Sequence, residues 1–393
     1  MELQDYFHPL CIEELDFFSL EQTSHLMGDN IYIYTEENPF PTISNFKIVL
    51  LGVPEEKNAY NNIGCSEGPD EIRKQLYQLY CHNNMPPITD LGNLKVGKTA
   101  NDTYIALTDV LNEIISDGAI PIILGGSQDL TYANYCTYEQ LNQVINIVSI
   151  DAKFDIGNED KKFKSNSYFH KIILKQPNYL FNYSNIGYQS YMVDKDEVVL
   201  MDKLYFDAYR LGIVQEDPID FEPVIRNADI LSLDMNAIRF SDSPGCKHTG
   251  PNGFTGKEIC QLVRYAGGSH KLSSFGIYEY NPSYDIMSQS AKLIAQIIWY
   301  FIDGYIMRQN DAPDIIKKNY YKYFVSLHAD AYEIVFYKSK ISNLWWMEIP
   351  AEAKNPQYSR HYLIPCSLKD YEKACNDEIP ERWLQTYKKI KIN

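Results

Sequence analysis

Two aspartates with a lysine between them stand where an apolar run of the sequence ends. The run covers residues 144–150, and the chain continues as Asp151-Ala152-Lys153-Phe154-Asp155. Two carboxylates held close together need a positive counter-charge, which either a metal ion or the lysine ammonium could supply. The residue types and their spacing therefore predict a charged site at this point of the chain.

Three other apolar runs also end in a carboxylate or an amide. The polar residues are Gln128 after a run at 119–124, Asp234 and Asn236 at the end of 229–236, and Glu279 at the end of 271–279. If the runs are neighbouring strands of a parallel sheet, their carboxyl ends meet at one edge, where ligands gather in such sheets. We therefore expect the four polar ends to converge on one crevice.

The runs that position these groups are typical of buried strands. Residues 144–150 are rich in Val and Ile and too short for a helix, which favours a central strand of a covered parallel sheet. Predicted strands, a short one at 211–214 among them, alternate with predicted helices at 102–117, 258–266 and 288–307. This alternation favours an α/β fold with a mainly parallel sheet.

The character of the sequence changes near residue 311. Runs at 320–325, 331–337 and 343–349 indicate β-strands, and a final helix begins near residue 380. We therefore expect an N-terminal arm at 1–45, an α/β domain at 46–310 and a small α+β extension at 311–393.

Composition excludes several classes of function. The chain of 393 residues has 36 Lys and Arg against 52 Asp and Glu, a net charge of -16. This charge argues against binding to nucleic acid or to an anionic membrane. The eight cysteines show no CxxC pair or zinc-finger spacing, and the longest apolar stretch, 293–306, is too short to cross a bilayer. We expect a cytoplasmic protein without membrane insertion.

Several segments together resemble the ureohydrolase superfamily of arginase, agmatinase and formiminoglutamase. They lie in the family's order between about residues 46 and 306. The stretches at 125–128, 151–155 and 232–236 are similar to its GGDH, DAHxD and SxDxDxxDP motifs, and those at 68–73, 252–258 and 279–285 to its GP-x-x-IR, GGLT-x-x-E and E-x-NP-x-x-D motifs. The resemblance implies a three-layer αβα arginase-like fold, with Glu279 as the family glutamate near the substrate's cationic group.

The resemblance also implies that three of the family's six manganese ligands are changed. Gln128 and Lys153 stand in place of two histidines, and Asn236 stands in place of an aspartate. A lysine ammonium has no lone pair to give to a metal. In the family, a hydroxide that bridges two manganese ions attacks the guanidinium or formimino carbon, so the loss of the second site removes that nucleophile.

Two arrangements of the remaining carboxylates follow. In the arrangement that we rank first, Asp151, Asp155 and Asp234 form a buried ion-paired cluster with Lys153, and no metal or other cofactor is bound. In the second, the three aspartates and Gln128 bind one divalent cation, Mg, Ca or Mn, because four oxygen donors suit a hard ion. The histidines that could replace the lost ligands are His170, His248 and His270.

Two main hypotheses on function result. The first is a pseudoenzyme with a vestigial pocket and no catalytic residues, which acts as a non-catalytic binding or scaffold module with a protein partner or as a homo-oligomer. The second is a divergent formiminoglutamase-like hydrolase of non-peptide C–N bonds in linear amidines, with one divalent metal or none. A third possibility keeps the old pocket as a sensor of a small cationic ligand gripped by Glu279.

Overall fold

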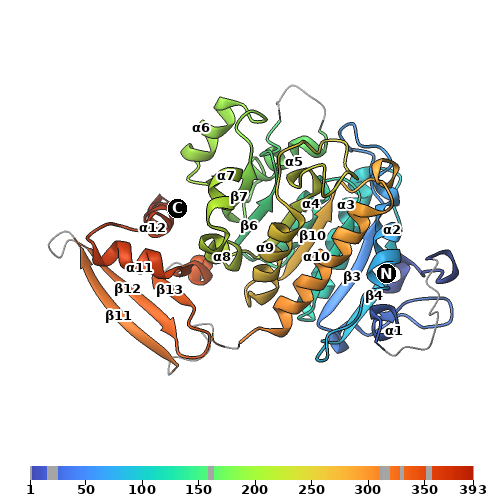
Figure 1. Ribbon diagram of the computed structural model, residues 1–393, viewed down its shortest axis with the longest axis horizontal. Coiled ribbons are helices and arrows are strands. Elements are labelled where there is room, and N and C mark those ends of the chain that lie inside the picture. Colours follow the sequence, from blue (N-terminus) through green and yellow to red (C-terminus); the bar gives the residue numbers. More distant parts are fainter. Residues whose placement is uncertain are drawn as a thin grey trace.

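A large sheet covered by helices on both faces forms the body of the molecule. The computed structural model describes residues 2–15, 25–157, 163–309, 311, 319–327, 332–350 and 356–392. Within these residues, a second and smaller sheet stands at one end of the body (Figure 1). The predicted three-layer α/β fold with a small C-terminal α+β part is thereby confirmed.

The large sheet is parallel except at one edge, where β1 runs antiparallel to β4. Its strands in spatial order are β1 (Phe7–His8), β4 (Ile88–Leu94), β3 (Ile48–Val53), β5 (Ile120–Gly125), β10 (Ser274–Tyr278), β9 (Ile230–Asp234), β6 (Ile145–Ile150), β7 (Leu180–Tyr188) and β8 (Asp207–Arg210), and β2 (Tyr32–Ile33) also pairs with β4. Every residue of the five central strands β3, β5, β10, β9 and β6 is buried. Burial on both faces explains why these strands are continuous apolar runs in the sequence.

Helices cover each face of this sheet (Figure 1). On one face lie α2 (Gly68–Leu76), α8 (Glu222–Arg226), α9 (Gly256–Gly268) and α10 (Gln289–Ile306), and on the other lie α3 (Ala100–Ser116), α4 (Leu130–Gln140) and α5 (Tyr168–Ile173). Alternate residues of β3 enter the two apolar cores, Ile48 and Leu50 on one side and Val49 and Leu51 on the other. This alternation follows from the two-residue period of a strand.

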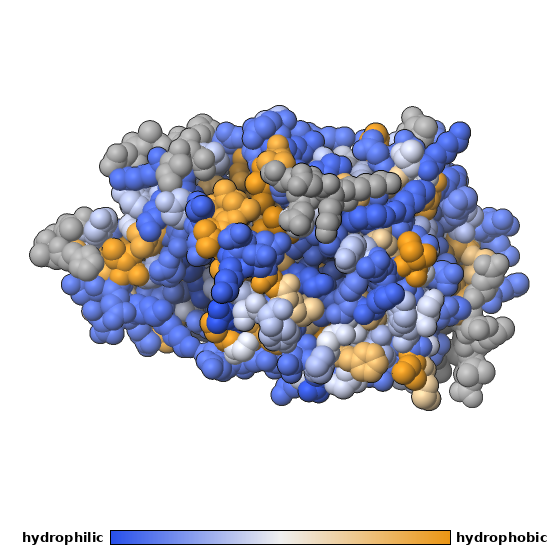
Figure 2. All heavy atoms as spheres, turned by 90° about the horizontal axis from the view of Figure 1, so that it is seen from above, coloured by the Kyte–Doolittle hydropathy of each residue, from blue (hydrophilic) through white to orange (hydrophobic). Residues whose placement is uncertain are grey.

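The described residues of the stretch 1–45 contribute two strands to the large sheet. Short helix α1 (Met27–Asn30) and strands β1 and β2 belong to this stretch, and both strands pair with β4. The division of the chain at residue 46 remains a prediction. No helix of the described residues is long and apolar enough to span a membrane, and Figure 2 shows hydrophilic side chains over most of the face it displays.

One predicted strand is wrong. Residues 211–214 lie in helix α7 (Leu211–Glu216), between β8 and α8, and α6 (Lys195–Lys203) precedes β8. Val214 is fully buried, whereas the neighbouring Ile213 is 55% exposed. A short apolar run does not distinguish a strand from one turn of helix, and here only one side of the run faces the core.

The second sheet is antiparallel throughout. It consists of β11 (Tyr320–Leu327), β12 (Tyr332–Ser339), β13 (Trp345–Glu348) and β14 (Leu363–Cys366), followed by α11 (Leu368–Cys375) and α12 (Glu381–Ile392). Trp383 of α12 is fully buried in its core. Arg226 of α8 donates to the carbonyl of Trp345, and His361 stacks on Phe181, so this part is docked on the body.

Candidate metal centre

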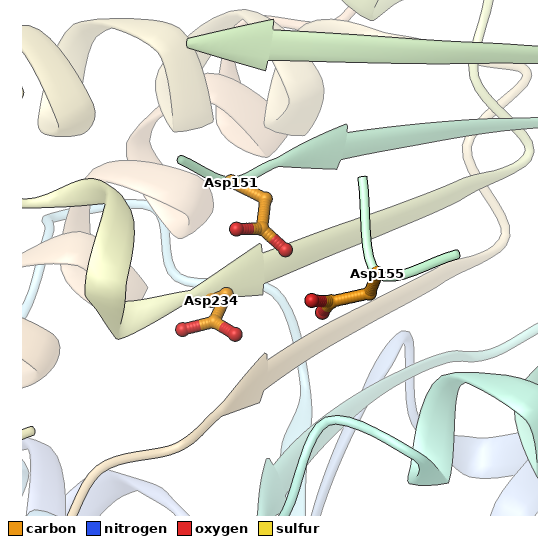
Figure 3. Close-up of side chains that lie close together, drawn as sticks. All are labelled: Asp151, Asp155 and Asp234. Carbon is orange, nitrogen blue, oxygen red and sulfur yellow. The ribbon is translucent and has the colours of Figure 1, made fainter. Parts of the chain in front are cut away.

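Two aspartates of the candidate site occupy the ends of neighbouring strands. Strands β6 and β9 pair in parallel, with Ile150 opposite Leu233, so the residues that follow in register are Asp151 and Asp234. Asp155 comes from the loop after β6, where its φ of 52° is left-handed, a conformation that aspartate tolerates better than most residues. Figure 3 shows the three carboxylates facing one space.

The three carboxylates form a compact and buried group. One oxygen from each lies within 4.8 Å of the others. The exposed fractions of Asp151, Asp155 and Asp234 are 0%, 7% and 2%. Such oxygens can reach one cation at once.

Backbone amides fix the orientation of two of these carboxylates. Asp151 Oδ1 accepts a hydrogen bond from the Lys153 N–H at 2.9 Å, and Asp234 Oδ1 accepts one from the Asn236 N–H at 2.7 Å. Asp151 Oδ2 is buried and has no donor among the described residues. Each loop thus holds one oxygen of its aspartate, and in Asp151 the other oxygen remains available to a ligand.

Burial and mutual repulsion disfavour the charged forms of the three carboxylates. Burial raises the pKa of Asp151 to about 6. The pKa values of Asp155 and Asp234 are raised well above the usual range by burial first and by the charge of Asp151 second. A buried carboxylate with its own cation shows the opposite direction, because the charged form is then favoured.

Lys153 does not neutralise the cluster in the way the sequence led us to expect. Among the ion pairs of the described residues, none joins its ammonium to Asp151, Asp155 or Asp234 within 4.0 Å. Its charge lowers the pKa values of Asp151 and Asp155, but burial has the larger effect. The ammonium therefore acts from a distance, while the backbone N–H of the same residue makes the direct contact.

The two amide residues differ in what their oxygens do. Gln128 donates through Nε2 to Ser232 Oγ at 2.9 Å, and its Oε1 is buried without a partner among the described residues. Asn236 Oδ1 accepts a hydrogen bond from the Ala152 N–H at 3.1 Å. Gln128 therefore offers a free acceptor and Asn236 does not.

Glu279 lies at the end of β10 in a hydrogen-bonded network. Its Oε1 accepts from the Gln128 N–H at 2.9 Å and its Oε2 accepts from Asn62 Nδ2 at 2.7 Å. Burial raises the pKa of Glu279 to about 7. Sequence reasoning missed Asn62, which lies in a polar loop where no motif distinguishes it from its neighbours.

The histidines proposed as substitutes are not among the clustered ligands of the described residues. His248 Nε2 lies 2.7 Å from the carbonyl oxygen of Tyr60, and its ring stacks on the same tyrosine. His270 Nε2 contacts the carbonyl of Gln309, next to the second sheet. The candidate donor set of this site therefore consists of oxygen atoms.

The chain is similar in sequence to a known protein family and to its members. The model of the Arginase family matches residues 46–303. The formimidoylglutamase of Staphylococcus carnosus is 26% identical over 269 residues, which cover 64% of this chain and 85% of that protein.

Solved structures agree on the fold. The formimidoylglutamase of Bacillus subtilis superposes with a TM-score of 0.66 at 19% identity, covering 75% of this chain and 96% of that one. The formiminoglutamase of Trypanosoma cruzi with Mn²⁺ gives 0.62 at 17% identity, covering 68% and 96%. The body of the chain therefore has the fold of these proteins, and the match by family ends before β11.

Proposed function

The chain belongs to the arginase family, and from this premise we propose that it is a formiminoglutamase-like hydrolase that cleaves a non-peptide C–N bond of a linear amidine with one divalent cation. The observation that carries the proposal is the group of three converging, buried carboxylates, to which no basic side chain of the described residues is bonded. Buried charges without a partner are strongly destabilising. A site that keeps them is better explained by a cation that binds there than by inheritance alone.

The residues present fit one cation. Asp151, Asp155 and Asp234 supply converging oxygens, and the unpartnered Gln128 Oε1 is available as a neutral donor. An all-oxygen set suits hard divalent ions such as Mg²⁺, Ca²⁺ or Mn²⁺. When bound, such an ion polarises the substrate and lowers the pKa of a nearby water.

The same residues do not fit a second cation. The position that would complete a second site holds Lys153, whose ammonium repels a metal, and Asn236, whose amide oxygen already accepts the Ala152 N–H. The reaction that we propose therefore uses one ion.

Glu279 is the residue that we assign to the cationic end of the substrate. Linear amidines are cations at neutral pH, and a carboxylate at the edge of the site is a natural partner for them. Asn62 and the Gln128 N–H fix its two oxygens, so the carboxylate is oriented before the substrate arrives. An ionised substrate would also favour the ionised form of Glu279, against the effect of burial.

Activity measurements on metal-free and reloaded protein test this proposal. Protein stripped with a chelator should release formamide from formiminoglutamate, or urea from arginine or agmatine, only after Mn²⁺, Mg²⁺ or Ca²⁺ is added. Asp155→Asn should abolish the release, whereas Asp217→Asn, a change in an exposed ion pair with Lys369, should not. No release from any substrate with any of the three ions would refute the hydrolase.

A second candidate function is favoured by one observation. The side chains of Lys153 and Asn236 make the second half of a two-ion site unusable, which is expected of a non-catalytic binding or scaffold protein. Under this alternative the cation would stabilise the fold alone. Stoichiometric metal binding with no turnover would support the non-catalytic module over the hydrolase.

A further inference from the structure

Strand β11 lies at an open edge of the second sheet. Among the described residues it pairs only with β12, and the paired residues of the two strands follow one another without a bulge. In Figure 1, β11 forms the outer margin of the second sheet, and no other labelled element lies beyond it. A regular strand of this kind at an edge is a template for the addition of another strand.

The pairing of β11 with β12 determines which backbone groups face the open edge. The N–H of Lys340 donates to the carbonyl of Asn319 at 2.9 Å, so residue 319 is turned toward β12. Residues of an antiparallel strand face the two sides in alternation, so the N–H and C=O groups of Lys322, Phe324 and Ser326 point away from β12. No backbone group of the described residues bonds to them. A second strand would satisfy these groups.

The side chains near this edge are apolar apart from one cation. Phe324 is 60% exposed and Tyr321 is 53% exposed. Lys322 Nζ lies 4.9 Å from the ring centroid of Phe324 and 5.4 Å from that of Tyr337. A charge on an edge strand restricts what can be added there, because an added strand must stabilise the ammonium as well as the backbone groups.

We propose that two copies of this chain associate by antiparallel pairing of their β11 strands, with the two-fold axis at Tyr323. In this register Lys322 lies opposite Phe324 of the second copy, and Phe324 lies opposite Lys322 of the second copy. Both residues have their backbone groups turned outward, so each of these pairs exchanges two hydrogen bonds. The two small sheets become one continuous sheet.

The same register also matches the side chains. The ammonium of Lys322 comes opposite the Phe324 ring of the second copy, which provides a cation–π contact. On the other face of the sheet, the exposed Tyr321 comes opposite Val325, and aromatic and β-branched residues form favourable cross-strand pairs. An axis at residue 322 would instead place two lysines directly opposite each other, which is unfavourable. The strand therefore fits a second copy of itself.

This contact is independent of the proposed hydrolase. Strand β11 lies outside residues 46–303, which match the Arginase family, and no residue of the carboxylate cluster belongs to the second sheet. Loss of the pairing and loss of hydrolysis are therefore separate outcomes.

Sedimentation equilibrium of the full chain, from ~1 to ~100 µM, tests the proposal. The chain of 45.5 kDa should associate reversibly into dimers. Phe324→Lys removes the ring and places like charges opposite each other at two positions, so it should weaken the association at least ~10-fold. Phe324→Glu is the matched variant, because it also removes the ring but places a carboxylate opposite Lys322, and it should retain the dimer. Phe240→Lys changes a phenylalanine of the body that is 52% exposed, and it should have no effect.

Hydrogen exchange locates the contact in the wild-type chain, without a substitution. The amides of Lys322 and Phe324 should exchange ~10-fold more slowly at ~100 µM than at ~1 µM, because they are bonded only in the dimer. The amide of Tyr323 faces β12 and should exchange at the same rate at both concentrations.

Three results would overturn the proposal. The first is a mass that stays at 45.5 kDa over the whole range of concentration. The second is an association that Phe324→Lys and Phe324→Glu affect alike. The third is exchange of the Lys322 and Phe324 amides that does not depend on concentration, which is decisive even if both variants fail to fold.

Discussion

Replacing Asp151 by asparagine should stabilise the metal-free protein. Asp151 is fully buried, and its pKa is raised from 3.8 to about 6. Because the pKa of Asp151 is raised in the folded state, its contribution to the free energy of unfolding is fully present below pH 3.8. That contribution is lost as the pH rises through 6. Above pH 6, ionised Asp151 therefore lowers the free energy of unfolding by ~3 kcal/mol. Asparagine removes the charge and keeps an oxygen that can accept the Lys153 N–H.

The measurement is urea unfolding, followed by circular dichroism, between pH 5 and pH 8. In a chelator at pH 8, Asp151→Asn should raise the free energy of unfolding by up to ~3 kcal/mol, and this gain should shrink at pH 5. Addition of Mn²⁺ or Mg²⁺ at 100 times the Kd should stabilise the wild type by ~2.7 kcal/mol. The variant should gain less, because it has lost a charged ligand.

Asp90 gives a matched control, because it is equally buried but has a permanent cation. Arg73 contacts both of its oxygens at 2.9 Å. Asp90→Asn should therefore cost ~3–5 kcal/mol with or without metal. If Asp151→Asn is destabilising at pH 8 in the same way, the cluster is neutralised from within, and the ion-paired arrangement with Lys153 is the right one.

Three further predictions follow from other contacts. The triple variant Gln128→His, Lys153→His, Asn236→Asp should bind two Mn²⁺ per chain by elemental analysis, against no more than one for the wild type. Lys153→Met should lower metal-free stability at pH 8, because the Lys153 charge lowers the pKa values of Asp151 and Asp155, and it should tighten binding of one cation in calorimetry by removing a repulsion. Burial lowers the pKa of Lys389 from 10.5 to about 8, although the charge of Asp207 acts in the opposite direction. Between pH 8 and pH 10.5 the unfolded chain therefore binds more protons than the folded one, and the free energy of unfolding rises with pH. The stability advantage of Lys389→Met in urea unfolding should accordingly fall by ~3 kcal/mol between pH 7 and pH 11.

The sequence predicts the convergence of the aspartates because strand order and register follow from general rules. The apolar run at 144–150 is long enough to specify a buried strand, and its end falls where β6 ends. The strand predicted at 211–214 failed because four apolar residues do not specify a period. Long patterns are thus predicted well, and short ones depend on contacts made elsewhere in the fold.

The sequence does not predict the charge state of the site. The sequence shows that Lys153 stands between Asp151 and Asp155, but the direction of a lysine side chain depends on the packing of its loop. The same limit applies to Asn62, whose contact with Glu279 joins residues 217 positions apart. Contacts of this range leave no periodic signal in one sequence.

The pairing of β6 with β9 has a consequence for ion selectivity. Asp151 and Asp234 are carried by adjacent hydrogen-bonded strands, whose spacing of ~4.8 Å is fixed by the backbone. The backbone positions of these two ligands are therefore fixed, and only rotation of their side chains can adapt them to the radius of an ion. Asp155 belongs to a loop, whose backbone is not held by strand pairing, so the choice between a small and a large divalent ion depends on the conformation of that loop.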